Sequence, residues 1–148
     1  MLRTIRTWVL VADGGRARVY ESLGPGTALR EVFHEDGAAL QTHEIASDRG
    51  GRRHDATGAG RHAVTAASDP QRHNEKEFAR RICGFLDRKA SAGAFDRLVL
   101  TAAPTTLGDI RENLHKASRA LVHAEVDKDF VPLSPHDLVD RLADVVRL

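Results

Sequence analysis

The sequence predicts a single α/β domain built on a mixed five-stranded sheet, with the element order β-β-β-α-β-α-β-α. First, the chain of 148 residues has the length of one domain. Second, residues 1–34 hold three short apolar segments separated by turn signals, which is typical of an antiparallel meander. Third, helical and strand-like patterns alternate from residue 69 onward, which predicts crossovers that add parallel strands beside the first one. This arrangement is the ribonuclease-H-like topology.

The first three strands are predicted from hydrophobic patterning. Residues 8–12 are all apolar, as expected for a strand buried on both faces, and an Asp-Gly-Gly turn signal follows. Residues 16–21 alternate polar and apolar side chains, which predicts a half-buried second strand. After the breaker Gly24-Pro25-Gly26, a third strand is predicted near residues 28–34.

The second half of the chain predicts three helices and two further strands. Asp69 followed by Pro70 is a helix start, because aspartate is a good N-cap and proline fits the first helical position. Apolar side chains then recur on one helical face until about Gly93. The remaining predicted elements are a buried strand at 95–101, a short helix from about 106, a strand at 120–127 and a helix opened by Ser134-Pro135 whose apolar stripe runs to Val146.

The region between the third strand and the first helix differs in composition. Between residues 45 and 78 the only large aliphatic side chain is Val64. So little apolar surface cannot offset the entropy of ordering this segment. We therefore predict one domain over residues 1–148 that carries a long mobile basic loop at about residues 46–68.

Composition excludes several classes of protein. Lys plus Arg number 22 and Asp plus Glu 21, so no global charge favours nucleic acid or an anionic membrane. The one cysteine, Cys83, excludes an intramolecular disulfide or a cysteine-based zinc site, and its helical position favours a buried apolar role. The apolar run at residues 8–12 is too short for a signal peptide or a membrane span. We expect a cytoplasmic protein that does not bind membranes.

Five blocks of sequence together resemble the bacterial host attachment family, whose members are named for attachment to host cells. The blocks lie, in order, at residues 8–20, 48–52, 73–78, 102–114 and 125–129. That family is similar to the central domain of archaeal and eukaryotic class-one translation termination factors. Those domains carry a Gly-Gly-Gln loop before a long basic helix, and the glutamine helps to hydrolyse peptidyl-tRNA. Here the corresponding residues are Gly50-Gly51-Arg52, without the glutamine, so the resemblance implies a non-enzymatic factor that engages tRNA or the ribosome.

The candidate nucleic-acid-binding residues cluster in and just after the predicted loop. Residues 49–73 contain five arginines and two aspartates, a local excess of +3. Arginine forks match phosphate oxygens, and glycine exposes backbone N–H groups, so this segment can hold an RNA backbone. The alternative interpretation is a solvated loop that its charges keep soluble. The candidates are Arg49, Gly50, Gly51, Arg52, Arg53, Arg61 and Arg72.

Metal-binding and catalytic candidates are fewer. His54, His62 and His73 can in principle hold a metal ion, but their spacing follows no compact metal signature, and we predict no cofactor. A two-metal nuclease needs several carboxylates at the ends of the central strands, and Asp13 is the one candidate at the end of the first strand. Possible partners for it are Glu75, Glu77, Asp127 and Asp129.

Two alternatives to RNA binding follow from these patterns. The first is a hydrolase that acts on peptidyl-tRNA or on a nucleic-acid backbone, for which the predicted fourth strand lacks an acid at its end. The second is a protein–protein interaction module. The Gly14-Gly15 pair is not followed by a nucleotide-binding fingerprint, and no G-x-S-x-G elbow is present.

Overall fold

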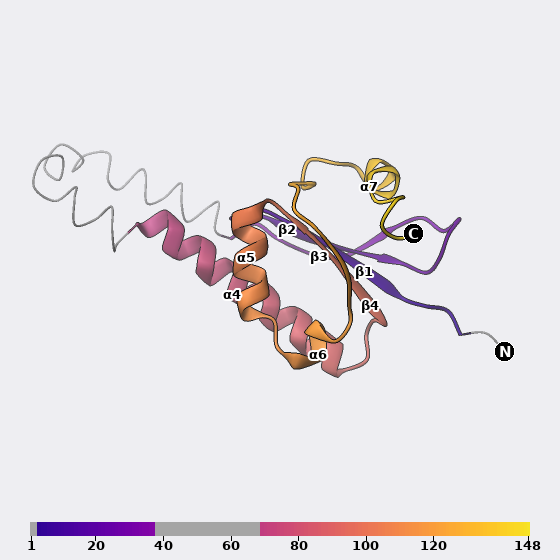
Figure 1. Ribbon diagram of the computed structural model, residues 1–148, viewed down its shortest axis with the longest axis horizontal. Coiled ribbons are helices and arrows are strands. Elements are labelled where there is room, and N and C mark those ends of the chain that lie inside the picture. The colour runs from indigo at the N-terminus through magenta and orange to yellow at the C-terminus, as the bar shows by residue number, and fades with distance from the viewer. Residues whose placement is uncertain (1–2, 38–68) are drawn as a thin grey trace, which may run out of the picture.

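The computed structural model describes residues 3–37 and 69–148, which form a five-stranded sheet with helices on both faces (Figure 1). The order of elements is the predicted one, with one additional short helix. The elements are β1 (Thr7–Ala12), β2 (Ala17–Ser22), β3 (Arg30–Glu35), α4 (Pro70–Ser91), β4 (Arg97–Ala102), α5 (Pro104–Asn113), α6 (Lys116–Arg119), β5 (Val122–Val126) and α7 (Pro135–Arg141).

The sheet has the strand order β3-β2-β1-β4-β5, so β1 lies at its centre. The meander prediction is confirmed, because β1 pairs antiparallel with β2, and β2 pairs antiparallel with β3. The two later strands pair parallel, β4 beside β1 and β5 beside β4. The carboxyl ends of β1, β4 and β5 therefore meet at one edge of the sheet.

Both faces of the sheet are covered, and each covering layer has its own core. Successive side chains of a strand point to opposite faces, so a strand that is buried on both sides must be apolar throughout. Along β1, Leu10 belongs to the core under α4 and α5, whereas Val9 belongs to the core under α7. The same division applies in β4, where Leu98 and Val99 pack into opposite cores. This arrangement explains the two uninterrupted apolar runs of the sequence.

Helix α4 is the longest element of the described residues, and its ends follow the predicted signals. The Asp69 side chain accepts hydrogen bonds from the backbone N–H groups of Gln71 (3.0 Å) and Arg72 (3.2 Å), which caps the first turn. Beyond the last turn, Gly93 has a φ of +75°, a conformation that glycine adopts without strain. The amino-terminal turns of α4 extend past the edge of the sheet (Figure 1).

The structure corrects several element boundaries. Helix α5 begins at Pro104, two residues before the predicted start, because proline fits the first helical position. Helix α6 lies where the sequence predicts no helix, and β5 is shorter than predicted. Helix α7 ends at Arg141, so Val145 of the predicted stripe lies beyond the helix and is 37% exposed, whereas Val146 is buried. The predicted loop at residues 46–68 lies outside the described residues.

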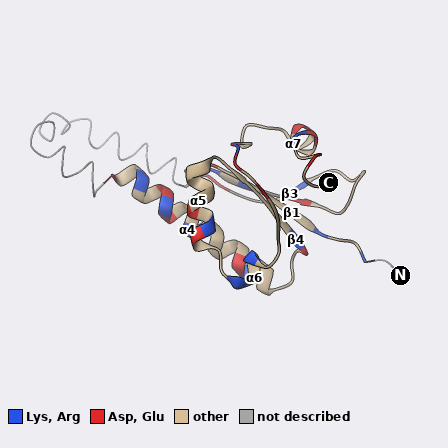
Figure 2. Cartoon of the chain, viewed as in Figure 1, with Lys and Arg blue, Asp and Glu red and all other residues tan. Residues whose placement is uncertain are grey.

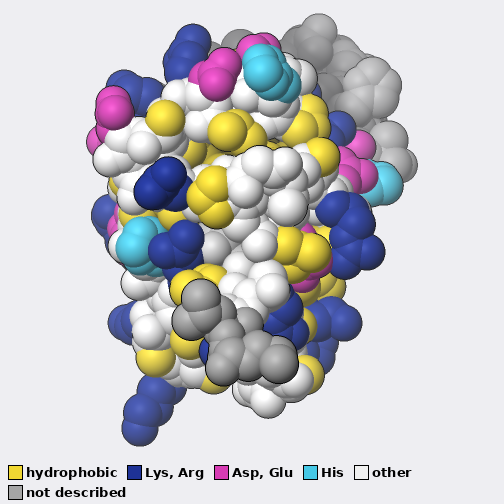
Figure 3. Space-filling model, turned by 90° about the vertical axis from the view of Figure 1, so that its right-hand side faces the viewer, with side chains coloured by type: hydrophobic (Ala, Val, Ile, Leu, Met, Phe, Trp, Pro, Cys, Tyr) yellow, Lys and Arg dark blue, Asp and Glu magenta, His cyan; other side chains and the backbone are white. Residues whose placement is uncertain are grey.

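Exposed apolar side chains in the described part of the chain are few. The large ones are Ile5, Leu23 and Val145, all outside the regular elements. Figure 3 shows the end of the molecule that carries both termini, where apolar side chains are interspersed with lysines and arginines. None of the exposed large hydrophobic residues is aromatic, so the described surface offers no large exposed ring for stacking against a base.

Candidate functional site

The turn after β1 is organised by Asp13. Its Oδ1 accepts hydrogen bonds from the backbone N–H groups of Gly15 (2.8 Å) and Arg16 (2.6 Å). Its Oδ2 accepts from Nε (3.0 Å) and Nη2 (2.8 Å) of the Arg16 guanidinium. This hydrogen bond and the charge of Asp13 raise the pKa of Arg16 above its ordinary value. Both carboxylate oxygens of Asp13, the catalytic candidate, are thus engaged in shaping the turn.

Helix α4 passes directly over this turn. A Cβ atom added to Gly14 would lie 2.7 Å from Oε2 and 2.8 Å from Cγ of Glu75, closer than real side chains approach. Glycine at position 14 therefore leaves room for the Glu75 side chain of α4 beside the turn. Gly14 of the Gly-Gly pair thus has a packing role here.

Arg72, one of the predicted nucleic-acid-binding residues, joins α4 to α5. Its Nη1 and Nη2 donate to Oδ2 (2.7 Å) and Oδ1 (2.6 Å) of Asp109, a two-pronged pairing, and Nη1 also donates to Glu75 Oε1 (3.1 Å). Asp109 is only 4% exposed, whereas the Arg72 side chain is 32% exposed. Its hydrogen bond to Asp109 raises the pKa of Arg72 although partial burial opposes the rise.

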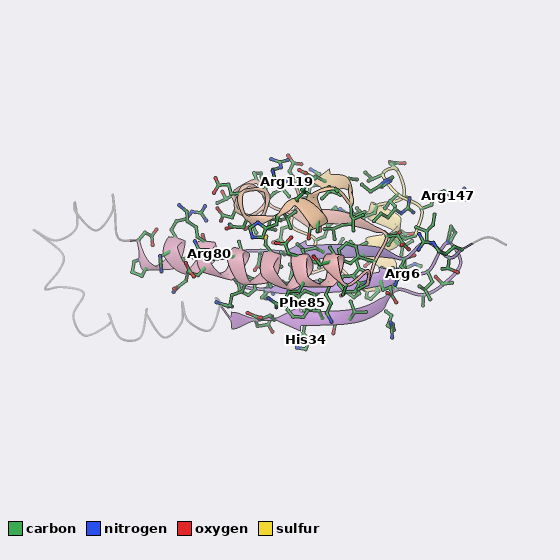
Figure 4. The ribbon with its side chains drawn as sticks, turned by 90° about the horizontal axis from the view of Figure 1, so that it is seen from below. Arg6, His34, Arg80, Phe85, Arg119 and Arg147 are labelled. Atoms are coloured by element: carbon green, nitrogen blue, oxygen red, sulfur yellow. The ribbon has the colours of Figure 1, made fainter. Side chains whose placement is uncertain are left out.

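The solvent-facing side of α4 carries a stripe of cations. The helix holds six lysines and arginines against three acids, a net charge of +3 with histidine neutral. Lys76, Arg80 and Arg88 are exposed and lie four or eight residues apart, which places them along one side of the helix. Between them is Gly84, whose Cβ position lies 3.4 Å from Arg88 Nη1. We call these three cations the α4 stripe; Figure 2 shows the charged residues along the helix and Figure 4 marks Arg80.

Of the other cations of α4, Arg72 and Arg81 bind carboxylates of other elements, and Lys89 lies over an aromatic ring of the helix itself. Arg81 donates to Glu35 Oε2 of β3 from Nε (3.0 Å) and Nη2 (2.8 Å). Lys89 lies 5.8 Å from the centre of the Phe85 ring, which itself stacks on Phe33 of β3. Within the described residues, Arg80 pairs with Glu77 of the same helix, one turn before it. Lys76, Arg80 and Arg88 are thus exposed cations of α4 that, within the described residues, have no carboxylate partner on another element.

Most predicted site residues lie outside the described part of the chain. This applies to Arg49, Gly50, Gly51, Arg52, Arg53 and Arg61, and to the metal candidates His54 and His62. His73 is exposed on the first turns of α4. Over residues 3–37 and 69–148, no group of three or more His, Cys, Asp or Glu side chains is placed to hold a metal ion.

The acidic residues considered as partners of Asp13 have other contacts or are exposed. Glu75 packs over Gly14 and accepts from Arg72, whereas Glu77 pairs with Arg80. Asp127 and Asp129 are exposed after β5, and Asp129 Oδ1 accepts a hydrogen bond from the Val131 N–H (3.0 Å).

Comparison with known proteins places the chain in a family. A family model described as "Protein required for attachment to host cells" matches residues 8–142. The chain belongs to this family. The match begins at the second residue of β1 and ends just beyond α7, so apart from Thr7 it covers the described helices and strands. A comparison with curated proteins finds no match.

The family assignment confirms the resemblance to the host attachment family, while the likeness to termination factors stays a prediction. Within the described residues of this family member, no helix is long and apolar enough to cross a bilayer.

Proposed function

We propose that this member of the host attachment family is a non-enzymatic RNA-binding factor that engages tRNA or the ribosome in the cytoplasm. The observation that carries the proposal is the α4 stripe. Along the sequence, the stripe follows the arginine- and glycine-rich segment at residues 49–61 and then Arg72. Together these residues form one basic stretch of sequence whose helical part presents its charge to solvent.

The geometry of the stripe suits a phosphate backbone. Twelve residues separate Lys76 from Arg88, so the stripe is about 18 Å long at 1.5 Å per helical residue. A cation on nearly every turn can meet several phosphates of one strand, and guanidinium groups bind phosphate oxygens in pairs. The Arg80–Glu77 pair is a surface pair within one helix, so a phosphate can replace it at little cost.

The binding we propose reads charge rather than base sequence. The aromatic side chains near α4 are committed to the core, where Trp8 stacks on Phe95 with ring centres 4.7 Å apart and Phe85 stacks on Phe33 at 4.0 Å. Phosphate contacts without base stacking give affinity that is largely independent of sequence and falls steeply with salt. Arg72, held by Asp109 and Glu75, contributes to this site by positioning the start of α4.

The proposal is tested by binding measurements on three sets of substitutions in the full chain. One variant carries K76A, R80A and R88A, and another carries R49A, R52A and R53A. The matched control carries K128A, R141A and R147A, three exposed cations that lie after β5 and outside the α4 stripe. Binding to purified tRNA, to a mixed-sequence single-stranded RNA and to bacterial ribosomes is measured between 50 and 200 mM salt.

We expect both site variants to bind more weakly and the control to bind as the wild type does. For single-stranded RNA, the slope of log affinity against log salt becomes shallower by roughly 0.7 for each phosphate that the variant no longer neutralises. Site variants that bind RNA as tightly as the wild type would refute the proposal. If the control variant loses as much affinity as the site variants, binding depends on the total charge of the protein and not on these residues. Hydrolysis of peptidyl-tRNA or of RNA by the wild-type protein would favour the hydrolase alternative.

A further inference from the structure

A small pocket lies between the α5–α6 connection and β5, apart from the α4 stripe. Its volume is about 270 Å³. Two arginines and one glutamate lie around an apolar floor, and the lining residues are Arg111, Leu114, Arg119, Val122 and Glu125. We call this the β5 pocket. Pockets for drug-sized molecules begin at about 300 Å³, so this one has room for a single side chain rather than a nucleotide.

The two arginines of the pocket are held in place by the protein. Arg119 Nη2 donates to the backbone carbonyls of Arg111 (2.7 Å) and Leu114 (2.8 Å), at the carboxyl end of α5. Within the described residues, Nε and Nη1 of Arg119 make no hydrogen bond. Arg111 donates from Nε to Glu125 Oε1 at 2.5 Å, and its two terminal nitrogens are likewise unbonded in that part of the chain. A fixed guanidinium loses little entropy when it binds a carboxylate.

The pocket depends on an irregularity in β5. Leu98 lies opposite Val122, but Val99 lies opposite Ala124, so the register shifts by one residue between them. Without the shift, Val122 and Glu125 would point to opposite faces of the sheet. With it, both line the same pocket under α5. The irregularity thus brings a carboxylate and an apolar side chain to the same side as the arginines.

The pocket adjoins an edge of the sheet. β5 is the outermost strand and pairs on one side with β4. No strand in the described part of the chain pairs with its other side. An exposed edge presents backbone N–H and C=O groups that an extended peptide can pair with, while alternate side chains of that peptide reach neighbouring pockets.

We infer that the β5 pocket and the outer edge of β5 form a docking site for an extended acidic peptide segment of a partner protein. The segment adds to the sheet beside β5, and one of its glutamate or aspartate side chains enters the pocket. Charge within the pocket favours this partner, since Glu125 offsets Arg111 and leaves Arg119 in excess. This inference is independent of RNA binding, because it uses none of the residues of the α4 stripe.

The test uses the full chain and two fluorescent ten-residue peptides, one of alternating glutamate and valine and one of alternating glutamine and valine. Binding is measured by fluorescence polarisation at low and at physiological salt. We compare the wild type with Arg111→Gln and Glu125→Gln, two exposed substitutions that leave the capping bonds of Arg119 intact. Lys128→Gln is the matched control, because Lys128 is exposed beyond the end of β5 and does not line the pocket. Amide hydrogen exchange of β5 is followed with and without the acidic peptide.

We expect the two substitutions to change the affinity for the acidic peptide in opposite directions. Arg111→Gln should weaken binding of the acidic peptide about fivefold, because a cation is removed and Glu125 is left unpaired. Glu125→Gln should strengthen it about threefold, because a like charge leaves the pocket. Backbone amides of residues 122–126 should exchange more slowly in the complex, and Lys128→Gln should change nothing.

Three outcomes would overturn the inference. Equal binding of the glutamine and glutamate peptides would show that the pocket does not select an acid. Weaker binding by the Glu125→Gln variant would contradict the charge argument. Binding without protection of the β5 amides would show that no strand is added at this edge.

Discussion

The pairing of Arg72 with Asp109 should contribute more to stability than any surface ion pair of this protein. Replacing Arg72 by alanine leaves the Asp109 carboxylate, which is 4% exposed, without its two charged hydrogen bonds of 2.6 and 2.7 Å. Removing one partner of a fully buried pair costs about 3–5 kcal/mol. The Arg72 side chain is 32% exposed, so water screens part of the interaction and we expect about 2–3 kcal/mol.

A double-mutant cycle separates this pairing from the other contacts of each residue. The variants are R72A, D109A and the double substitution, measured by urea unfolding at neutral pH. We expect R72A to lower the free energy of unfolding by about 2–3 kcal/mol, which in a thermal melt corresponds to roughly 4–12 °C at 2–4 °C per kcal/mol for a chain of this size. The double variant should recover part of that stability, because the buried carboxylate is removed with its partner.

The cycle has a clear refuting result. A coupling energy below about 0.5 kcal/mol would place this pair among ordinary surface pairs, and Arg72 would then not be what joins α4 to α5. The ion pair between Arg72 and Glu75 is absent from both R72A arms of the cycle, so it cancels from the coupling energy.

Three further predictions follow from the described contacts. Gly14→Ala should destabilise the protein by about 0.5–1.5 kcal/mol in urea, because its Cβ would meet the flexible Glu75 carboxylate at 2.7 Å and displace it from Arg72. Gly108→Ala should stabilise the protein slightly, because its Cβ would have open space within a helix. Glu21→Gln should lower the free energy of unfolding by about 1–2 kcal/mol at pH 7 and make that free energy depend less on pH in the acid range. Although burial raises the pKa of Glu21, hydrogen bonds from Trp8 and Arg30 lower it overall, so its contribution is present above the ordinary pKa and is lost as pH falls through the lower folded value. Burial raises the pKa of Cys83 to about 12, so iodoacetamide at pH 8 should modify Cys83 only after unfolding, as mass spectrometry would show.

Most helices and strands could be predicted because their signals are local. The apolar run of β1 and the Asp69-Pro70 start of α4 depend on neighbouring residues alone. Helix α6 could not be found in this way, because a long-range contact holds it. Asp87 of α4 accepts hydrogen bonds from the N–H of His115 (3.1 Å) and the hydroxyl of Ser118 (2.6 Å), and no local pattern in the sequence encodes that pairing.

In the candidate site, too, the long-range partners of charged residues could not be predicted from neighbouring residues. Local charge alone predicts a nucleic-acid-binding role for Arg72, and no neighbouring residue signals its long-range partner Asp109. Asp109 lies on the side of α5 away from Leu107 and Leu114, where helical periodicity predicts exposure. It is buried because α4 packs against that side, which is a tertiary contact. The role of the arginines in the β5 pocket could not be predicted for a similar reason. A register shift in β5 places Glu125 beside Arg111.

These contacts also change how the charge of α4 bears on RNA binding. The helix has a net charge of +3, but Arg72 and Arg81 bind carboxylates of other elements, so their positive charge is already balanced. An arginine in a buried pair cannot exchange its partner for phosphate without leaving that carboxylate unpaired, whereas Arg80 can leave Glu77 at little cost. The stripe therefore offers about three phosphate contacts, which corresponds to a salt slope of roughly −2 on single-stranded RNA. A steeper slope in the wild type requires cations beyond α4, and the variant at Arg49, Arg52 and Arg53 measures their share.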